Sequence, residues 1–232
     1  MIMYKGLNMI TCGMENCYII RGEKGDVLID TGSEKHRKEI GRWLQEFDPR
    51  LIILTHGHND HIENAAYFAD IYGIPIMISP YDLRLARDNK CREYYNLTPL
   101  GHILRRENKR CMERKVPQID PKIFAIPDMD LSPYGIRGRI VNLEGHTKGS
   151  VGILCEGEMG VDLYAGDAVM NIFSPSLPMI AESPKKAITT AAYIAKLSPE
   201  RILCGHGKPI CKGQNEYSRF MNKFSNKIKG EM

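Results

Sequence analysis

The sequence lacks the features of disulfide-bonded secreted proteins and of membrane-spanning proteins. Its seven cysteines are an odd number, irregularly spaced and without a CxxC pair, which argues against a disulfide framework or a cysteine-rich zinc site. No uncharged apolar run approaches the roughly 20 residues that span a bilayer. The opening MIMYKGLNMI has neither the basic start nor the apolar core of a secretion signal. We therefore expect a cytoplasmic protein with no membrane segment, whose cysteines are reduced and mostly packing residues.

A large excess of one charge is also lacking. The formal net charge of +4 is too small to indicate nucleic-acid binding by itself. The charge is uneven, however, because residues 83–115 contain ten Lys and Arg against four acidic residues. This segment is either a solvated helical surface or a basic wall beside a site for anionic substrates. We expect a small-molecule substrate, anionic on the second interpretation, and no nucleic-acid partner.

Apolar periodicity predicts alternating strands and helices. Strand-like runs occupy 2–10, 16–20, 26–29, 50–55, 74–79, 136–143, 150–155, 161–165 and the RILC run at 201–204. Helical spacing is found at 34–47, 62–72, 184–197 and 215–228, and two further helices, broken near residues 98–101, are expected in the basic segment. No linker is evident, so we expect a single domain over 1–232 with a basic helical insertion at about 80–120.

Histidines gather in polar loops that directly follow apolar strands. Three lie within six residues, in the HGHNDH sequence at 56–61. Gly145-His146-Thr147, Gly166-Asp167 and Gly205-His206-Gly207 also follow strand-like runs. Because similar strands lead into the loops at His56 and His206, we expect histidines from distant parts of the chain to meet at one edge of a sheet.

This pattern predicts a metal centre with two cations. In a loop, residues two apart can turn toward one point, so His56 and His58 can share one cation while Asp60 and His61 reach another. A catalytic tetrahedral ion accepts about three protein ligands plus water, so seven ligands suit two ions. The candidates are His56, His58, Asp60, His61, His146, Asp167 and His206. All-His/Asp ligation favours zinc, with iron or manganese as alternatives.

The sequence resembles the metallo-β-lactamase superfamily over almost its whole length. The matching elements are LIDTG (28–32), THGHNDH (55–61), GHTKGS (145–150), GD (166–167) and GHG (205–207). The resemblance implies an αββα sandwich, with two mixed sheets face to face, helices outside and the metals at one rim.

The resemblance also implies a role for each ligand. His56, His58 and His146 would bind the first metal; Asp60, His61 and His206 would bind the second; and Asp167 would bridge them. Asp30 would orient the ligand loop through hydrogen bonds, or it simply occupies the turn after a strand.

Such a centre acts by general chemistry. Two cations about 3.5–4 Å apart share a water whose pKa falls toward ~7, so a bridging hydroxide can attack a carbonyl or phosphoryl centre. Asp60 or a second water would return the proton. No serine or cysteine nucleophile is needed, and we assign none.

Departures from the patterns of particular branches of the family narrow the range of possible reactions. Asp167 stands where many true β-lactamases have a cysteine, and Met170 stands where signal lactonases commonly have a tyrosine. The 26 residues after His206 cannot supply the C-terminal helical domain of glyoxalase II-type thioesterases. His58 argues against the flavo-diiron branch, which usually has an acid there.

Three hypotheses follow. The first is a dinuclear hydrolase of an ester, thioester, lactone or phosphoester. The second is a mononuclear iron oxygenase of the persulfide dioxygenase type, which the presence of His206 disfavours. The third, a non-catalytic binding module, is disfavoured because all seven ligands are present. We expect His36, His102 and Cys17 to lie outside the site, and the insertion to cover the metal rim.

Overall fold

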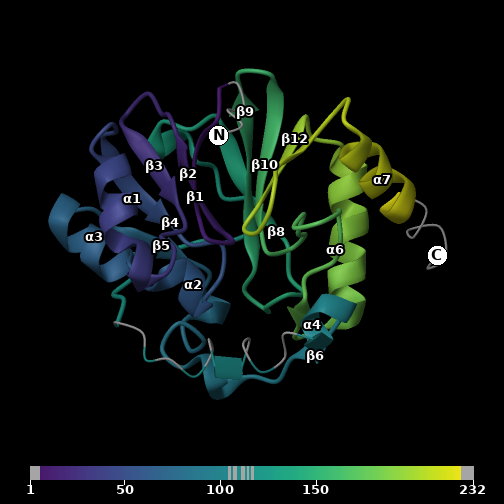
Figure 1. Cartoon of the computed structure of the whole chain (residues 1–232). Helices are drawn as coiled ribbons and strands as arrows, with labels where there is room; N and C mark the ends of the chain where they lie inside the picture. The colour runs from purple at the N-terminus through teal and green to yellow at the C-terminus, as the bar shows by residue number, and fades with distance from the viewer. Residues whose placement is uncertain are drawn as a thin grey trace.

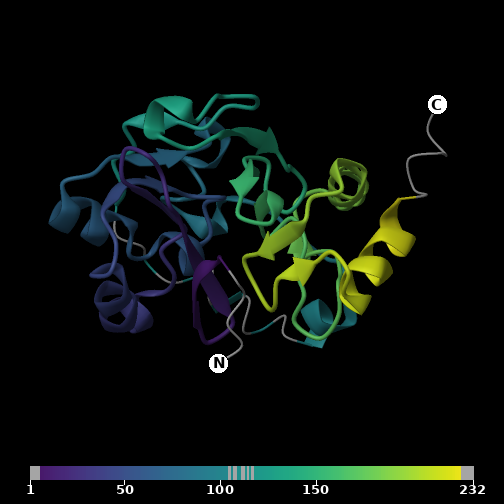
Figure 2. The same cartoon turned by 90° about the horizontal axis from the view of Figure 1, so that it is seen from above.

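Two β-sheets lie face to face, and helices cover the outer face of each (Figure 1; Figure 2). The predicted αββα sandwich is therefore confirmed. The architecture is that of a computed structural model, which describes residues 6–225 except 104–105, 107–108, 111–112, 114 and 116–117.

The first sheet has the strand order β1-β2-β3-β4-β5-β7. Strands β1 to β3 pair antiparallel, whereas β3, β4, β5 and β7 pair parallel. The bounds are β1 (Asn8–Cys12), β2 (Glu15–Ile20), β3 (Asp26–Ile29), β4 (Pro49–Ile53), β5 (Ile76–Ile78) and β7 (Ile123–Phe124).

The second sheet has the order β13-β12-β10-β9-β8, and only its β10–β12 pair is parallel. A separate small sheet pairs β6 with β11. The bounds are β6 (Tyr95–Asn96), β8 (Gly138–Asn142), β9 (Val151–Gly157), β10 (Gly160–Gly166), β11 (Ile180–Ala181), β12 (Arg201–Cys204) and β13 (Ile210–Cys211).

The helices divide between the two outer faces. Helices α1 and α3 cover the first sheet, and α6 and α7 cover the second (Figure 1). The α-helices are α1 (Arg37–Leu44), α2 (Asn59–Ile62), α3 (Ala65–Tyr72), α4 (Pro99–Ile103), α6 (Pro184–Leu197) and α7 (Asn215–Phe224). Short 3-10 helices are η1 (Glu34–His36), η2 (Pro80–Asp82), η3 (Asn89–Cys91) and η4 (Ser132–Tyr134).

Burial on both faces explains the continuous apolar strands. In β4, Leu51 and Ile53 belong to the core between the two sheets, while Ile52 packs with α1 and α3 on the other side. A parallel strand that is covered on both faces needs no polar alternation. The run that was predicted as a strand from composition alone is thus a central strand of the sandwich.

The helix prediction holds best where local signals are strong. Helix α6 has the predicted bounds: the side chain of its N-cap Ser183 accepts a hydrogen bond from the Lys186 amide, and Pro184 occupies the first turn. Helix α7 starts as predicted and ends at Phe224, while the predicted end at Ile228 lies outside the described residues.

The basic insertion differs from the prediction. Between residues 83 and 98 the chain forms a 3-10 turn and the two-residue strand β6 instead of a helix. Helix α4 begins at Pro99, where a break in the helix was predicted. Proline is tolerated there because backbone N–H groups in the first turn of a helix make no hydrogen bond within the helix. Arg105, which belongs to the segment expected to cover the metal rim, lies outside the described residues.

The candidate loops meet at one rim of the sandwich. The loop with His56 follows β4, Asp167 follows β10 and the loop with His206 follows β12. Backbone hydrogen bonds join the halves there: Val151 N donates to Thr55 O at 2.9 Å, and Asn16 N donates to Gly205 O at 2.9 Å. Over the described part of the chain, no helix has the length and apolar character needed to cross a membrane.

Candidate metal centre

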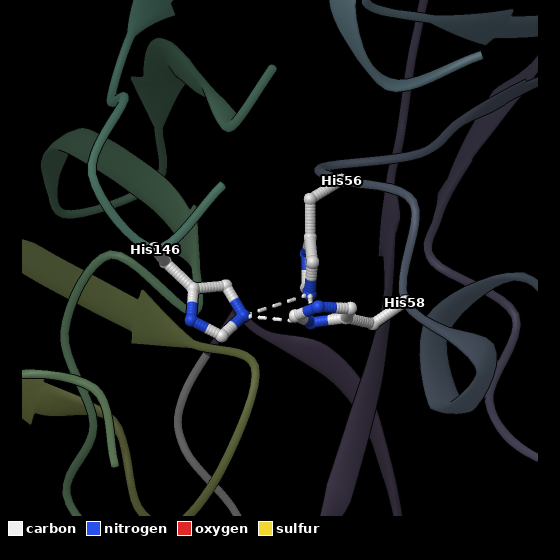
Figure 3. A group of neighbouring side chains, drawn as sticks. All are labelled: His56, His58 and His146. Carbon is white, nitrogen blue, oxygen red and sulfur yellow. Dashed lines mark hydrogen bonds between the residues drawn. The ribbon is translucent and has the colours of Figure 1, made fainter. Parts of the chain in front are cut away.

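Three buried imidazole rings form the first group. The Nε2 atom of His56, the Nδ1 atom of His58 and the Nε2 atom of His146 are separated by 3.1, 3.2 and 2.9 Å. His146 faces the other two from the opposite side of the site (Figure 3). Ligands at about 2.0–2.1 Å from a tetrahedral zinc lie about 3.3–3.4 Å apart. The three nitrogens therefore have close to the mutual spacing that one cation requires.

Burial also sets the charge of two members of this group, His56 and His58. It lowers the pKa of His56 and of His58 well below the usual range, and the neighbouring imidazoles lower both further. Neutral rings at pH 7 have a lone pair on one nitrogen, which is the form that binds a metal.

Asp60, His61 and His206 form the second group. The Nε2 atom of His206 lies 3.4 Å from Asp60 Oδ2 and 3.4 Å from His61 Nε2. His61 and His206 are buried, whereas 22% of the Asp60 side chain is exposed. Asp60 is thus the member of this group that solvent or a substrate reaches most easily.

Asp167 lies between the two groups. Its Oδ1 atom is 3.4 Å from His61 Nε2, and its Oδ2 atom is 3.3 Å from His206 Nε2 and 3.5 Å from His146 Nε2. The Oδ1 atom is buried and has no hydrogen-bond partner among the described residues. A buried carboxylate oxygen without a donor is costly unless a cation binds it.

The electrostatics of the second group differ from those of the first. Burial lowers the pKa of His61, but the carboxylates of Asp30, Asp167 and Asp60 raise it to about 9. Burial also lowers the pKa of His206. Its contacts with Asp167 and Asp60 outweigh burial and raise this pKa well above the usual range. The carboxyl pKa values of Asp60 and Asp167 fall well below their usual range: burial raises them, but the histidines outweigh it. Without cations, protons on His61 and His206 balance the negative charge of the neighbouring carboxylates.

Each of the five histidines has its other ring nitrogen held by a neighbour. The distances are His61 Nδ1 to Asp30 Oδ2, 2.8 Å; His206 Nδ1 to Met14 O, 3.0 Å; His146 Nδ1 to Ile180 O, 2.8 Å; His56 Nδ1 to Thr55 Oγ1, 3.1 Å; and His58 Nε2 to the Tyr94 hydroxyl, 2.9 Å. Such contacts fix the tautomer and orientation of a metal ligand.

Asp30 holds the 55–61 loop. Its buried carboxylate accepts hydrogen bonds from the Thr55 amide and hydroxyl, both at 2.8 Å, and contacts His61. Its φ of 56° is left-handed, a conformation that aspartate tolerates better than most residues. Its place is therefore more than that of a turn residue.

Asp82 was not predicted from the sequence, whereas Tyr94, which contacts His58, lies in the insertion that was expected to cover the metal rim. The buried Asp82 carboxylate accepts hydrogen bonds from Gly57 N (3.0 Å), Thr147 Oγ1 (2.7 Å) and Gly149 N (2.9 Å), and pairs with Arg92 (2.9 Å). It thereby joins the two loops that carry the first group. The sequence signal that could have identified it is its position just after the apolar run at 74–79, which resembles the position of Asp167 after β10.

Three residues expected outside the site do lie outside it. His36 is in η1, where its Nδ1 atom is 3.5 Å from the Glu39 carboxylate. His102 is exposed on α4. Cys17 is buried in the core between the first sheet and its helices.

The donor set fits divalent cations. Five imidazoles and two carboxylates converge, with an orphaned carboxylate oxygen between the groups and inward nitrogens that face one another. The four-layer sandwich with a His/Asp-rich rim built from both sheets defines a class of metal-site proteins.

Comparison with known proteins agrees with this class. A family model, the metallo-beta-lactamase superfamily, matches residues 10–206. The chain belongs to the metallo-beta-lactamase superfamily, whose members are mostly metal-dependent hydrolases.

Individual relatives are distant. The chain is 27% identical to the probable metallo-hydrolase YflN of Bacillus subtilis (strain 168), over 89% of this chain and 85% of that protein. It is 26% identical to the hydroxyacylglutathione hydrolase GloC of Haemophilus influenzae, over 93% and 97% of the two chains. The crystal structure of TTHA1623 in a di-iron-bound form has a TM-score of 0.63 at 22% identity, covering 88% and 92%.

Proposed function

We propose that this protein is a dinuclear metal-dependent hydrolase that acts on an ester, thioester, lactone or phosphoester. The observation that carries the proposal is the Asp167 carboxylate, whose two oxygens lie toward histidines of both groups. A carboxylate in that position is suited to bridge two cations. His56, His58 and His146 would hold the first cation, and Asp60, His61 and His206 the second.

The chemistry combines the cations with side chains placed to move protons. When bound, divalent cations lower the pKa of water and polarise the oxygen of a carbonyl or phosphoryl group. Asp60, the partly exposed carboxylate, is placed to accept a proton and return it to the leaving group. Asp30 keeps His61 oriented by accepting a hydrogen bond from its outer nitrogen.

The relatives favour a thioester among the candidate substrates. GloC is a hydroxyacylglutathione hydrolase, and hydroxyacylglutathiones are thioesters. We propose a small-molecule substrate, for which the exposed Arg84, Arg87 and Lys90 of the basic insertion offer positive charge if it is anionic. Zinc remains the first metal we propose, and the di-iron form of TTHA1623 makes iron the second.

Metal content and turnover test the proposal together. Protein purified without chelator is analysed for metals and then assayed on an ester, a thioester, a lactone, a phosphodiester and a β-lactam. Two equivalents of metal with hydrolysis support it. One iron per chain with oxygen uptake on a persulfide would replace it with the dioxygenase hypothesis. Metal-free purified protein without turnover would favour a binding module.

His58→Ala should remove the metal of the first group and abolish hydrolysis, because two imidazole ligands remain where three are needed. Metal content and the rate on the best substrate measure the effect. His102→Ala, which alters an exposed histidine on α4, serves as the matched control and should keep both. Full activity in His58→Ala would refute the assignment.

A further inference from the structure

Residues 80–103 form a segment, here called the strap, that contacts loops of both halves. On one side, Asn89 Nδ2 donates to Gly57 O at 2.9 Å, and Asn89 Oδ1 accepts from Asn59 N at 3.0 Å. On the other side, β6 pairs with β11, and Leu97 N donates to Met179 O at 2.9 Å. The elements β6 and α4 lie at the bottom of the molecule as it is drawn in Figure 1. The strap therefore spans the candidate metal centre.

Tyr94 is the strap residue that contacts a candidate ligand. Its hydroxyl lies 2.9 Å from His58 Nε2, and the two ring centroids are 5.2 Å apart. Its neighbour Tyr95 is 57% exposed, since successive side chains of an extended segment point to opposite sides. Arg92 lies two residues before Tyr94 and forms ion pairs with Asp82 and Glu182, which hold the backbone that leads to Tyr94 in place.

The contact suits the form of His58 that binds a cation. Its Nδ1 atom faces His56 and His146, so binding a cation requires a lone pair there and a proton on Nε2. The Tyr94 oxygen is placed to accept that proton in a hydrogen bond.

We propose that Tyr94 is a positioning residue, which holds His58 in the tautomer and orientation that bind the first cation and so makes that cation dependent on the strap. The inference rests on the proposed function. It concerns one site only, because the outer nitrogens of the other four histidines contact Thr55, Asp30, Ile180 or Met14, which lie outside the strap. Among the five, His58 is the histidine whose outer nitrogen directly contacts a residue of the strap.

Tyr94→Phe tests the proposal because it removes the hydroxyl and keeps the ring. Zinc affinities of both ions are measured by chelator competition, with Tyr95→Phe as the matched control. We expect the first ion to bind about 10–100-fold more weakly in Tyr94→Phe, the range seen when such outer contacts are removed. The second ion should bind as in the wild-type protein, and Tyr95→Phe should match the wild type for both.

A second measurement reads the hydrogen bond at His58 Nε2 in the zinc-loaded protein. With ¹⁵N-labelled histidine, NMR should show a slowly exchanging Nε2 proton on His58 in the wild type and in Tyr95→Phe, and a faster-exchanging one in Tyr94→Phe. Wild-type affinities and proton exchange in Tyr94→Phe would overturn the proposal, as would equal changes in the two variants. Failure of the wild-type protein to bind two ions would instead refute the proposed function.

Discussion

At the level of single residues, the two groups of ligands differ in whether their histidines must lose a proton before a cation can bind. His56 and His58 are buried beside other imidazoles, which keeps their pKa values low. His61 lies beside three carboxylates, and its pKa rises to about 9 although burial opposes this. A cation that binds at the second group therefore displaces protons at neutral pH. His56 and His58 of the first group are already neutral and have no such proton to lose.

This contrast predicts the pH dependence of metal binding. The protonated form of His61 predominates below pH 9, so the affinity of the second group should rise between pH 7 and pH 9, by up to ~10-fold per pH unit for each proton displaced. His56 and His58 should release no protons over that range, because burial and the neighbouring imidazoles keep their pKa values low. Calorimetric titration in buffers of different ionisation heat counts the protons released. Metal binding to the second group without proton release at pH 7 would contradict this.

At the scale of elements, the fold relies on polar contacts to hold the ligand loops. Asp82, at the end of η2, accepts hydrogen bonds from Gly57 in one loop and from Thr147 and Gly149 in another. These loops follow strands of different sheets, so no ladder of backbone hydrogen bonds fixes their spacing. A buried carboxylate with three donors fixes it instead.

Asp82→Ala should lower the free energy of unfolding of the metal-free protein by about 3 kcal/mol, because it leaves buried donors without an acceptor. Urea denaturation measures the loss. The control Asp120→Ala removes an aspartate whose side chain is 83% exposed and which pairs with Lys122, so its effect should stay within about 0.5 kcal/mol. Equal stability of the two variants would show that Asp82 does not hold the loops.

At the scale of the whole molecule, the proposed ligands come from both halves of the sandwich. His56 to His61 follow a strand of the first sheet, while His146, Asp167 and His206 follow strands of the second. Cations bound there would join the two sheets at the rim, where the described backbone offers few hydrogen bonds between them.

Removal of the metals should therefore destabilise the whole fold. A ligand present at 100 times its Kd adds about 2.7 kcal/mol, and two such ions should raise Tm by roughly 10–20 °C in a chain of this size. Thermal melts before and after chelation, and after zinc is restored, measure the shift. An unchanged Tm in protein shown to have lost its metal would contradict a cross-linking role.

Much of the scaffold could be predicted because its signals are local. The apolar run of β4 and the capped helix α6 follow from composition and from the Ser183-Pro184 start. The insertion could not be predicted well, since its basic composition suits a helix but its backbone pairs with β11 and with the ligand loops. Tertiary contacts outweigh weak helix propensity there.

The sequence by itself determined which side chains would gather, since HGHNDH and the three later loops each follow an apolar strand that has to be buried. Only the tertiary structure decided how they are held: Tyr94 against His58, Asp30 against His61 and Asp82 between two loops. The physical reason is separation, because these partners are 25 to 67 residues apart along the chain and local periodicity contains no information about them.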